Sequence, residues 1–84
     1  MKIQADEAIL WLRAYAAETA AFGNEAAELS DEMLRLLNTA MSLGGWTQWK
    51  NDHPDTYQTA WPRWLTMCER QKWLRETLAA RDAA

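Results

Sequence analysis

His53 and Cys68 are the only histidine and cysteine of the chain, so any cysteine–histidine nucleophile pair must use both. In such a pair the imidazole accepts the thiol proton and activates the sulfur. Cys68, however, shares an apolar stripe with Trp64 and Leu65, where a thiol behaves as a small hydrophobic group. Buried cysteines of this kind are seldom reactive. The sequence therefore predicts a structural cysteine and a protein that is not an enzyme.

Asp52, His53 and Asp55 could be metal ligands, but a structural zinc site takes four ligands, usually cysteine and histidine. Helix capping explains the same residues, because Pro54 is well tolerated at a first helical position. Asp52 or His53 would then be the cap. Gly44-Gly45 lacks the spacing and the following lysine of a phosphate-binding loop. We expect no catalytic residue, no metal and no cofactor.

Trp73 indicates a binding function. It lies about 100° off the stripe of Leu74 and Leu78, on a helix face with charged neighbours. Exposed tryptophan and arginine are the residue types that most often anchor protein interfaces, and Arg70 could stack on the indole. Packing under the N-terminal helix is the alternative. The predicted partner-binding residues on this face are Trp73, Arg70 and Arg63.

Two W-x-x-W pairs, Trp46/Trp49 and Trp61/Trp64, would each show both rings on one side of a helix. Such a pair could accept a partner helix, a peptide or a small apolar ligand. It could equally replace missing aliphatic side chains in the core. We expect Trp61 and Trp64 to be core residues. For Trp46 and Trp49 both interpretations stay open.

Glu25, Glu28 and Glu32 recur at three- and four-residue steps and would line one helix face. A row of carboxylates can dock on a basic surface or imitate a row of phosphates. A solvated face near a helix start is the alternative interpretation.

Hydrophobic periodicity predicts the helices that carry these residues. The first spans about 4–22 and ends at Gly23-Asn24, which favours a left-handed stop. The second spans about 25–43, or begins at Asp31, and ends at Gly44-Gly45.

A short third helix starts at Pro54. The last helix spans about 62–81, with a break or kink at Trp61-Pro62, because proline disfavours helical geometry in the preceding residue. The chain has no valine, two isoleucines, ten leucines, fifteen alanines and six tryptophans, a composition typical of helices. We therefore expect one domain, 1–84, that is all-α: a compact four-helix bundle with a tryptophan-rich core.

The net charge of −3 argues against a nucleic-acid-binding protein, which is usually basic. The apolar run Ala8–Leu12 is too short to cross a membrane, no signal peptide is recognisable, and a single cysteine fits the cytoplasm. A second stripe of the first helix, lined by alanines, would allow close approach inside the domain or across a homodimer. Its residues are Leu10, Ala14, Ala17 and Ala21.

These features favour a non-catalytic protein–protein interaction module, a small accessory or inhibitor protein with another protein as its partner. By analogy of size and charge, the concrete form is a phage or mobile-element protein of the anti-CRISPR or anti-restriction type. One alternative is a small-ligand or peptide binder with a tryptophan cage. A second is a helical nucleic-acid-binding domain.

Overall fold

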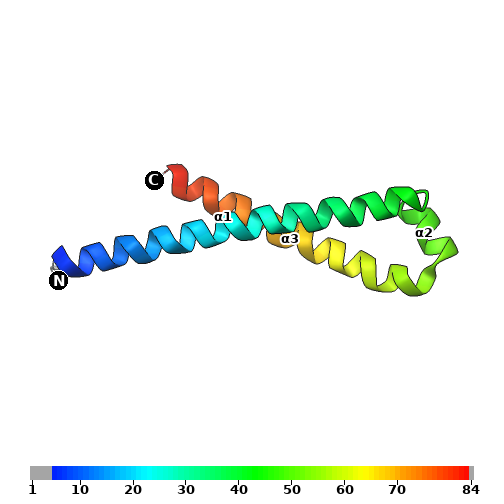
Figure 1. The fold of residues 1–84 in the computed structure, drawn as a ribbon, viewed down its shortest axis with the longest axis horizontal. Helices are drawn as coiled ribbons and strands as arrows, with labels where there is room; N and C mark the ends of the chain where they lie inside the picture. The colour runs from blue at the N-terminus through cyan, green and yellow to red at the C-terminus, as the bar shows by residue number, and fades with distance from the viewer. Residues whose placement is uncertain (1–4, 84) are drawn as a thin grey trace.

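The computed structural model describes residues 5–83, which form three helices: α1 (Ala5–Ser42), α2 (Trp46–Asp52) and α3 (Pro54–Ala83). The two long helices run antiparallel and α2 joins them at one end, which gives an extended hairpin (Figure 1). The hairpin measures 63 × 19 × 17 Å, and its radius of gyration is 19.0 Å. A compact chain of this length would have a radius of about 12 Å. The all-α class is confirmed, whereas the compact four-helix bundle is wrong.

Helix α1 runs through Gly23-Asn24, where the sequence predicts a stop. Gly23 keeps a negative φ, unlike the turn glycines. A glycine inside a helix costs about 1 kcal/mol relative to alanine, and contacts with α3 on both sides of Gly23 offset this cost. Thr19 and Glu25 both bind arginines of α3. A separate second helix beginning near Glu25 or at Asp31 is therefore also wrong.

Helix α3 begins at Pro54 as predicted but does not break at Trp61-Pro62. Pro62 lacks the N–H that would bond to the carbonyl of Gln58. Both residues are exposed, so water can hydrate that carbonyl. The two expected helices of this region are one, and the described residues contain no cis peptide bond.

The predicted stop at Gly44-Gly45 is confirmed. Both glycines have a positive φ, 93° and 103°, a conformation that side chains with a Cβ rarely adopt. The Gly45 N–H donates to the carbonyl of Ala40 at 2.8 Å, and the Gly44 N–H donates to that of Met41 at 3.1 Å. These bonds satisfy carbonyls that the end of α1 leaves free.

The contact between α1 and α3 follows a seven-residue repeat. On each helix, residues at alternating steps of three and four are buried or half-buried, as in a coiled coil. We call this set the seam. In α1 it comprises Thr19, Phe22, Ala26, Leu29, Met33, Leu36, Ala40 and Leu43, and in α3 Ala60, Trp64, Met67, Gln71, Leu74, Leu78 and Arg81.

At the closed end, α2 covers the seam with an aromatic cluster. Trp49 is 5% exposed and packs with the buried alanines Ala40 and Ala60. Its indole N–H donates to the Thr56 hydroxyl at 2.8 Å. Tryptophan thus fills the core at this end, where aliphatic side chains are few.

Candidate interaction site

Three ion pairs join α1 and α3 along one side of the hairpin, which we call the charged flank. Their glutamates, Glu18, Glu25 and Glu32, follow each other at steps of seven residues. The carboxylates of Glu25 and Glu32 lie 2.5 Å from Arg70 and Arg63, respectively. The third pair joins Glu18 to Arg81. Four residues predicted to bind a partner therefore bind one another, namely Glu25, Glu32, Arg63 and Arg70.

The hydrogen bonds from Arg70 lower the pKa of Glu25, and burial opposes this effect only in part. The same bonds raise the pKa of Arg70 above its ordinary value. Both side chains remain partly open to water, at 42% for Arg70 and 37% for Glu25, where ion pairs contribute little to stability. Glu28, the third predicted carboxylate, is exposed and makes no salt bridge within residues 5–83.

Trp73 also lies on the charged flank. Its ring meets Phe22 edge to face, with the centroids 5.2 Å apart. The guanidinium of Arg70 lies 4.5 Å from the Trp73 centroid. The residue nevertheless stays 44% exposed, so Trp73 is packed on one side and open to solvent on the other.

The second predicted pair, Trp46/Trp49, lies at the closed end with its rings stacked, 5.4 Å between centroids and 7° between planes. Trp46 also contacts Trp61 and Trp64, at centroid distances of 5.1 and 5.5 Å. The two W-x-x-W pairs thus pack on each other. They form one aromatic cluster within the chain, in which Trp46, Trp61 and Trp64 stay half-buried.

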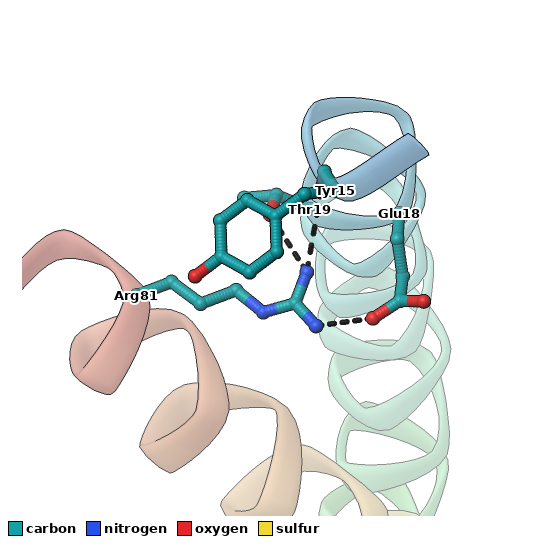
Figure 2. Close-up of polar contacts among 4 residues, drawn as sticks. All are labelled: Tyr15, Glu18, Thr19 and Arg81. Carbon is teal, nitrogen blue, oxygen red and sulfur yellow. Dashed lines mark hydrogen bonds and ion pairs between the residues drawn. The ribbon is translucent and has the colours of Figure 1, made fainter. Parts of the chain in front are cut away.

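Arg81 makes the last contacts between α3 and α1 at the open end of the hairpin (Figure 2). Its guanidinium lies over the Tyr15 ring, 4.4 Å from the centroid. Its Nη1 donates to the Thr19 hydroxyl at 2.8 Å, and its Nη2 pairs with Glu18. Sequence reasoning missed Arg81, although it occupies a seam position in the seven-residue repeat.

Beyond the C-terminal end of α3, α1 continues toward its N-terminus with no helix opposite it in the described chain (Figure 1). We call residues 8–15 the arm. The spacing of the seam continues into it through Ala8, Leu12 and Tyr15. The arm nevertheless leaves five large apolar side chains exposed: Ile9 48%, Leu10 62%, Trp11 73%, Leu12 68% and Tyr15 47%.

The exposed side chains of the arm surround α1 instead of forming a single stripe. A shallow hollow on it is lined by Leu10, Trp11 and Ala14. Sequence reasoning did not single out Trp11. The seven-residue repeat carried a signal for this exposure. The last seam residue of α3 is Arg81, which lies opposite Tyr15, so the next seam position of α1, Leu12, has no partner on α3.

The histidine and the cysteine considered as a nucleophile pair occupy different parts of the described chain. His53 follows α2 and directly precedes α3. Cys68 lies fourteen residues beyond Pro54, the first residue of α3, which is about 21 Å along the helix. Within residues 5–83 no three His, Cys, Asp or Glu side chains are grouped so that they could hold a metal ion. None of the described helices combines the length and the apolar character that crossing a bilayer requires.

No family model, curated protein or solved structure matches the chain.

Proposed function

We propose that the chain is a non-catalytic protein-binding module and that the arm is its docking element. The observation that carries the proposal is the exposure of five large apolar side chains within seven residues of one helix. Contiguous apolar surface of this kind marks interaction sites in proteins. Tryptophan is the residue that most often dominates binding energy, and Trp11 is the most exposed of the five.

The arm suits insertion into an apolar groove of another protein. Leu12 and Tyr15 lie one helical turn apart, and Trp11 extends the apolar surface round the helix. Helices that bind in grooves use anchors at this spacing. Because α1 is one continuous helix, the arm is already helical before it binds, which lowers the entropy cost of association.

The chemistry of the partner follows from the arm and from the charges beside it. Asp6 and Glu7 precede the apolar side chains in the first turn of α1. A fitting partner therefore has an apolar groove with a basic rim at one end. The role of an accessory or inhibitor protein that acts on a larger nucleic-acid-handling complex remains part of the proposal, on the grounds of small size and acidic charge.

Affinity capture from an extract of the native host tests the proposal, with the wild-type chain, Trp11→Ala and Trp73→Ala as baits. Trp73→Ala is the matched control, because it removes the same side chain from the charged flank. We expect Trp11→Ala to lose the captured protein, with about thirtyfold weaker binding on reconstitution, as for an interface hot spot. Loss with Trp73→Ala and retention with Trp11→Ala would move the docking site to the charged flank and contradict the proposal.

A further inference from the structure

The two flanks of the hairpin differ in chemistry. All three ion pairs between α1 and α3 lie on the charged flank. The opposite side, which we call the apolar flank, carries Leu34, Leu37 and Met41 of α1 and Leu65 and Cys68 of α3. Leu34 is 57% exposed, Met41 66% and Leu65 45%, whereas Leu37 and Cys68 are half-buried. In an isolated antiparallel helix pair both flanks face water, so a difference in polarity between them indicates that the apolar one is covered.

The apolar flank is also hollowed between the helices. One hollow is bordered by Leu34, Leu37 and Trp64, and a second by Cys68 and Lys72. Met33, Gln71 and Arg75 line both hollows, so they adjoin each other.

Gln71 is an unusual residue for this place. It is 5% exposed, and its Oε1 has no hydrogen-bond partner among the described residues. Its amide nitrogen donates to the Ser30 hydroxyl at 2.7 Å and to the carbonyl of Ala26 at 3.2 Å. An acceptor that is buried and unpaired costs free energy. The isolated chain therefore leaves one hydrogen-bond acceptor without a partner at the base of the two hollows.

The solvent-accessible area of the chain is larger than that of a typical folded monomer of the same mass. The chain exposes 6586 Å², whereas a folded monomer of 9.7 kDa exposes about 5,100 Å². The excess is about 1,500 Å². A stable protein interface removes about 800 Å² from each partner, and those of obligate homodimers remove more. Part of this excess belongs to the arm, and the remainder leaves room for an interface of standard size with a second hairpin.

From these observations we propose that a second copy of this chain packs on the apolar flank, so that two hairpins form a four-helix bundle. A second copy presents the same apolar surface over the same length, as an isologous interface requires. Lys72, Arg75 and Glu76 at the edge of the flank supply both signs of charge, so two copies can pair without opposing only like charges. Because only one flank is apolar, the assembly closes at two chains. The arm stays available, so this proposal does not depend on the docking role of the arm.

Sedimentation equilibrium over a concentration series tests the dimer. We expect the wild type to approach twice the chain mass of 9.7 kDa, and the double variant Leu34→Glu/Leu65→Glu to remain a monomer. The matched control Asn38→Glu/Thr66→Glu adds the same charges at exposed positions outside the apolar flank, and it should dimerise like the wild type. Circular dichroism checks that each variant keeps its helices.

Thiol reactivity of Cys68 gives a readout that needs no substitution. We expect its rate of alkylation to fall as the concentration rises through the dimerisation range, because the second copy covers it. A wild type that stays monomeric overturns the proposal. So does a dimer that Leu34→Glu/Leu65→Glu retains and Trp11→Ala loses, since the second copy would then sit on the arm. A dimer whose Cys68 reacts at an unchanged rate also overturns it.

Discussion

Replacing Gly23 with alanine tests whether α1 is one helix. Gly23 is exposed and has no positive φ, and a Cβ built on it meets nothing within 4 Å. The substitution therefore introduces no clash and removes only the cost of a glycine in a helix, about 0.5–1 kcal/mol. For a domain of this size, 1 kcal/mol shifts Tm by about 4–8 °C.

The helix stop predicted from the sequence would make Gly23→Ala destabilising instead of stabilising. If Gly23 were a left-handed stop between two helices, alanine would have to adopt a positive φ, at a cost of about 1–2 kcal/mol. The two arrangements thus differ by about 1.5–3 kcal/mol in the effect of one methyl group on the free energy of unfolding.

Thermal unfolding followed by circular dichroism, at one fixed protein concentration, measures this difference. Gly44→Ala is the control for a glycine whose conformation matters, because its φ is 93° and an added Cβ would lie 3.0 Å from Cγ of Gln48. We expect Gly23→Ala to raise Tm and Gly44→Ala to lower it. A lower Tm for Gly23→Ala would refute the continuous helix.

Three further predictions concern the contacts between the helices. Glu25→Gln removes the carboxylate whose pKa Arg70 lowers; this pairing stabilises the fold above the ordinary glutamate pKa of about 4.3 and is lost as pH falls through the lowered value. The variant should therefore lose less stability than the wild type in acid, and an identical pH profile of Tm would contradict the pairing. Gln71→Leu removes the unpaired Oε1 and should raise the free energy of unfolding in urea by about 1 kcal/mol; a loss would show that Oε1 has a partner. Arg81→Ala should destabilise the chain by about 1 kcal/mol and speed amide exchange around Thr19, and unchanged exchange there would mean that Arg81 does not hold the open end.

The sequence predicted the helical class, the start of α3 at Pro54 and the stop at Gly44-Gly45, because these depend on local propensity and capping. It failed at Gly23, and the break that was one of two expectations at Pro62 is absent. Both residues disfavour a helix locally, but tertiary contacts decide the outcome, and the seam continues past each of them.

The candidate site was harder to predict, because exposure depends on the relative lengths of the two long helices. The sequence of α1 alone does not distinguish Trp11 as exposed, and its exposure follows from the end of α3 near Tyr15. Likewise, Glu25 and Glu32 form an acidic row in α1 alone. Only the antiparallel register brings Arg70 and Arg63 beside them.

The seven-residue spacing of the three glutamates on the charged flank affects how α1 and α3 are aligned. Sliding α3 along α1 by seven residues would set Arg63 against Glu25 and Arg70 against Glu18. The shifted alignment would lose only the pair of Arg81 with Glu18, and partly exposed ion pairs contribute little to stability, so electrostatics favours the observed alignment only weakly. What does distinguish them is the short connection through α2 and the bond from Gln71 to Ser30. A buried polar residue in a coiled-coil interface is known to specify register at a cost in stability. Gln71 would then specify the register that the ion pairs of the charged flank favour only weakly.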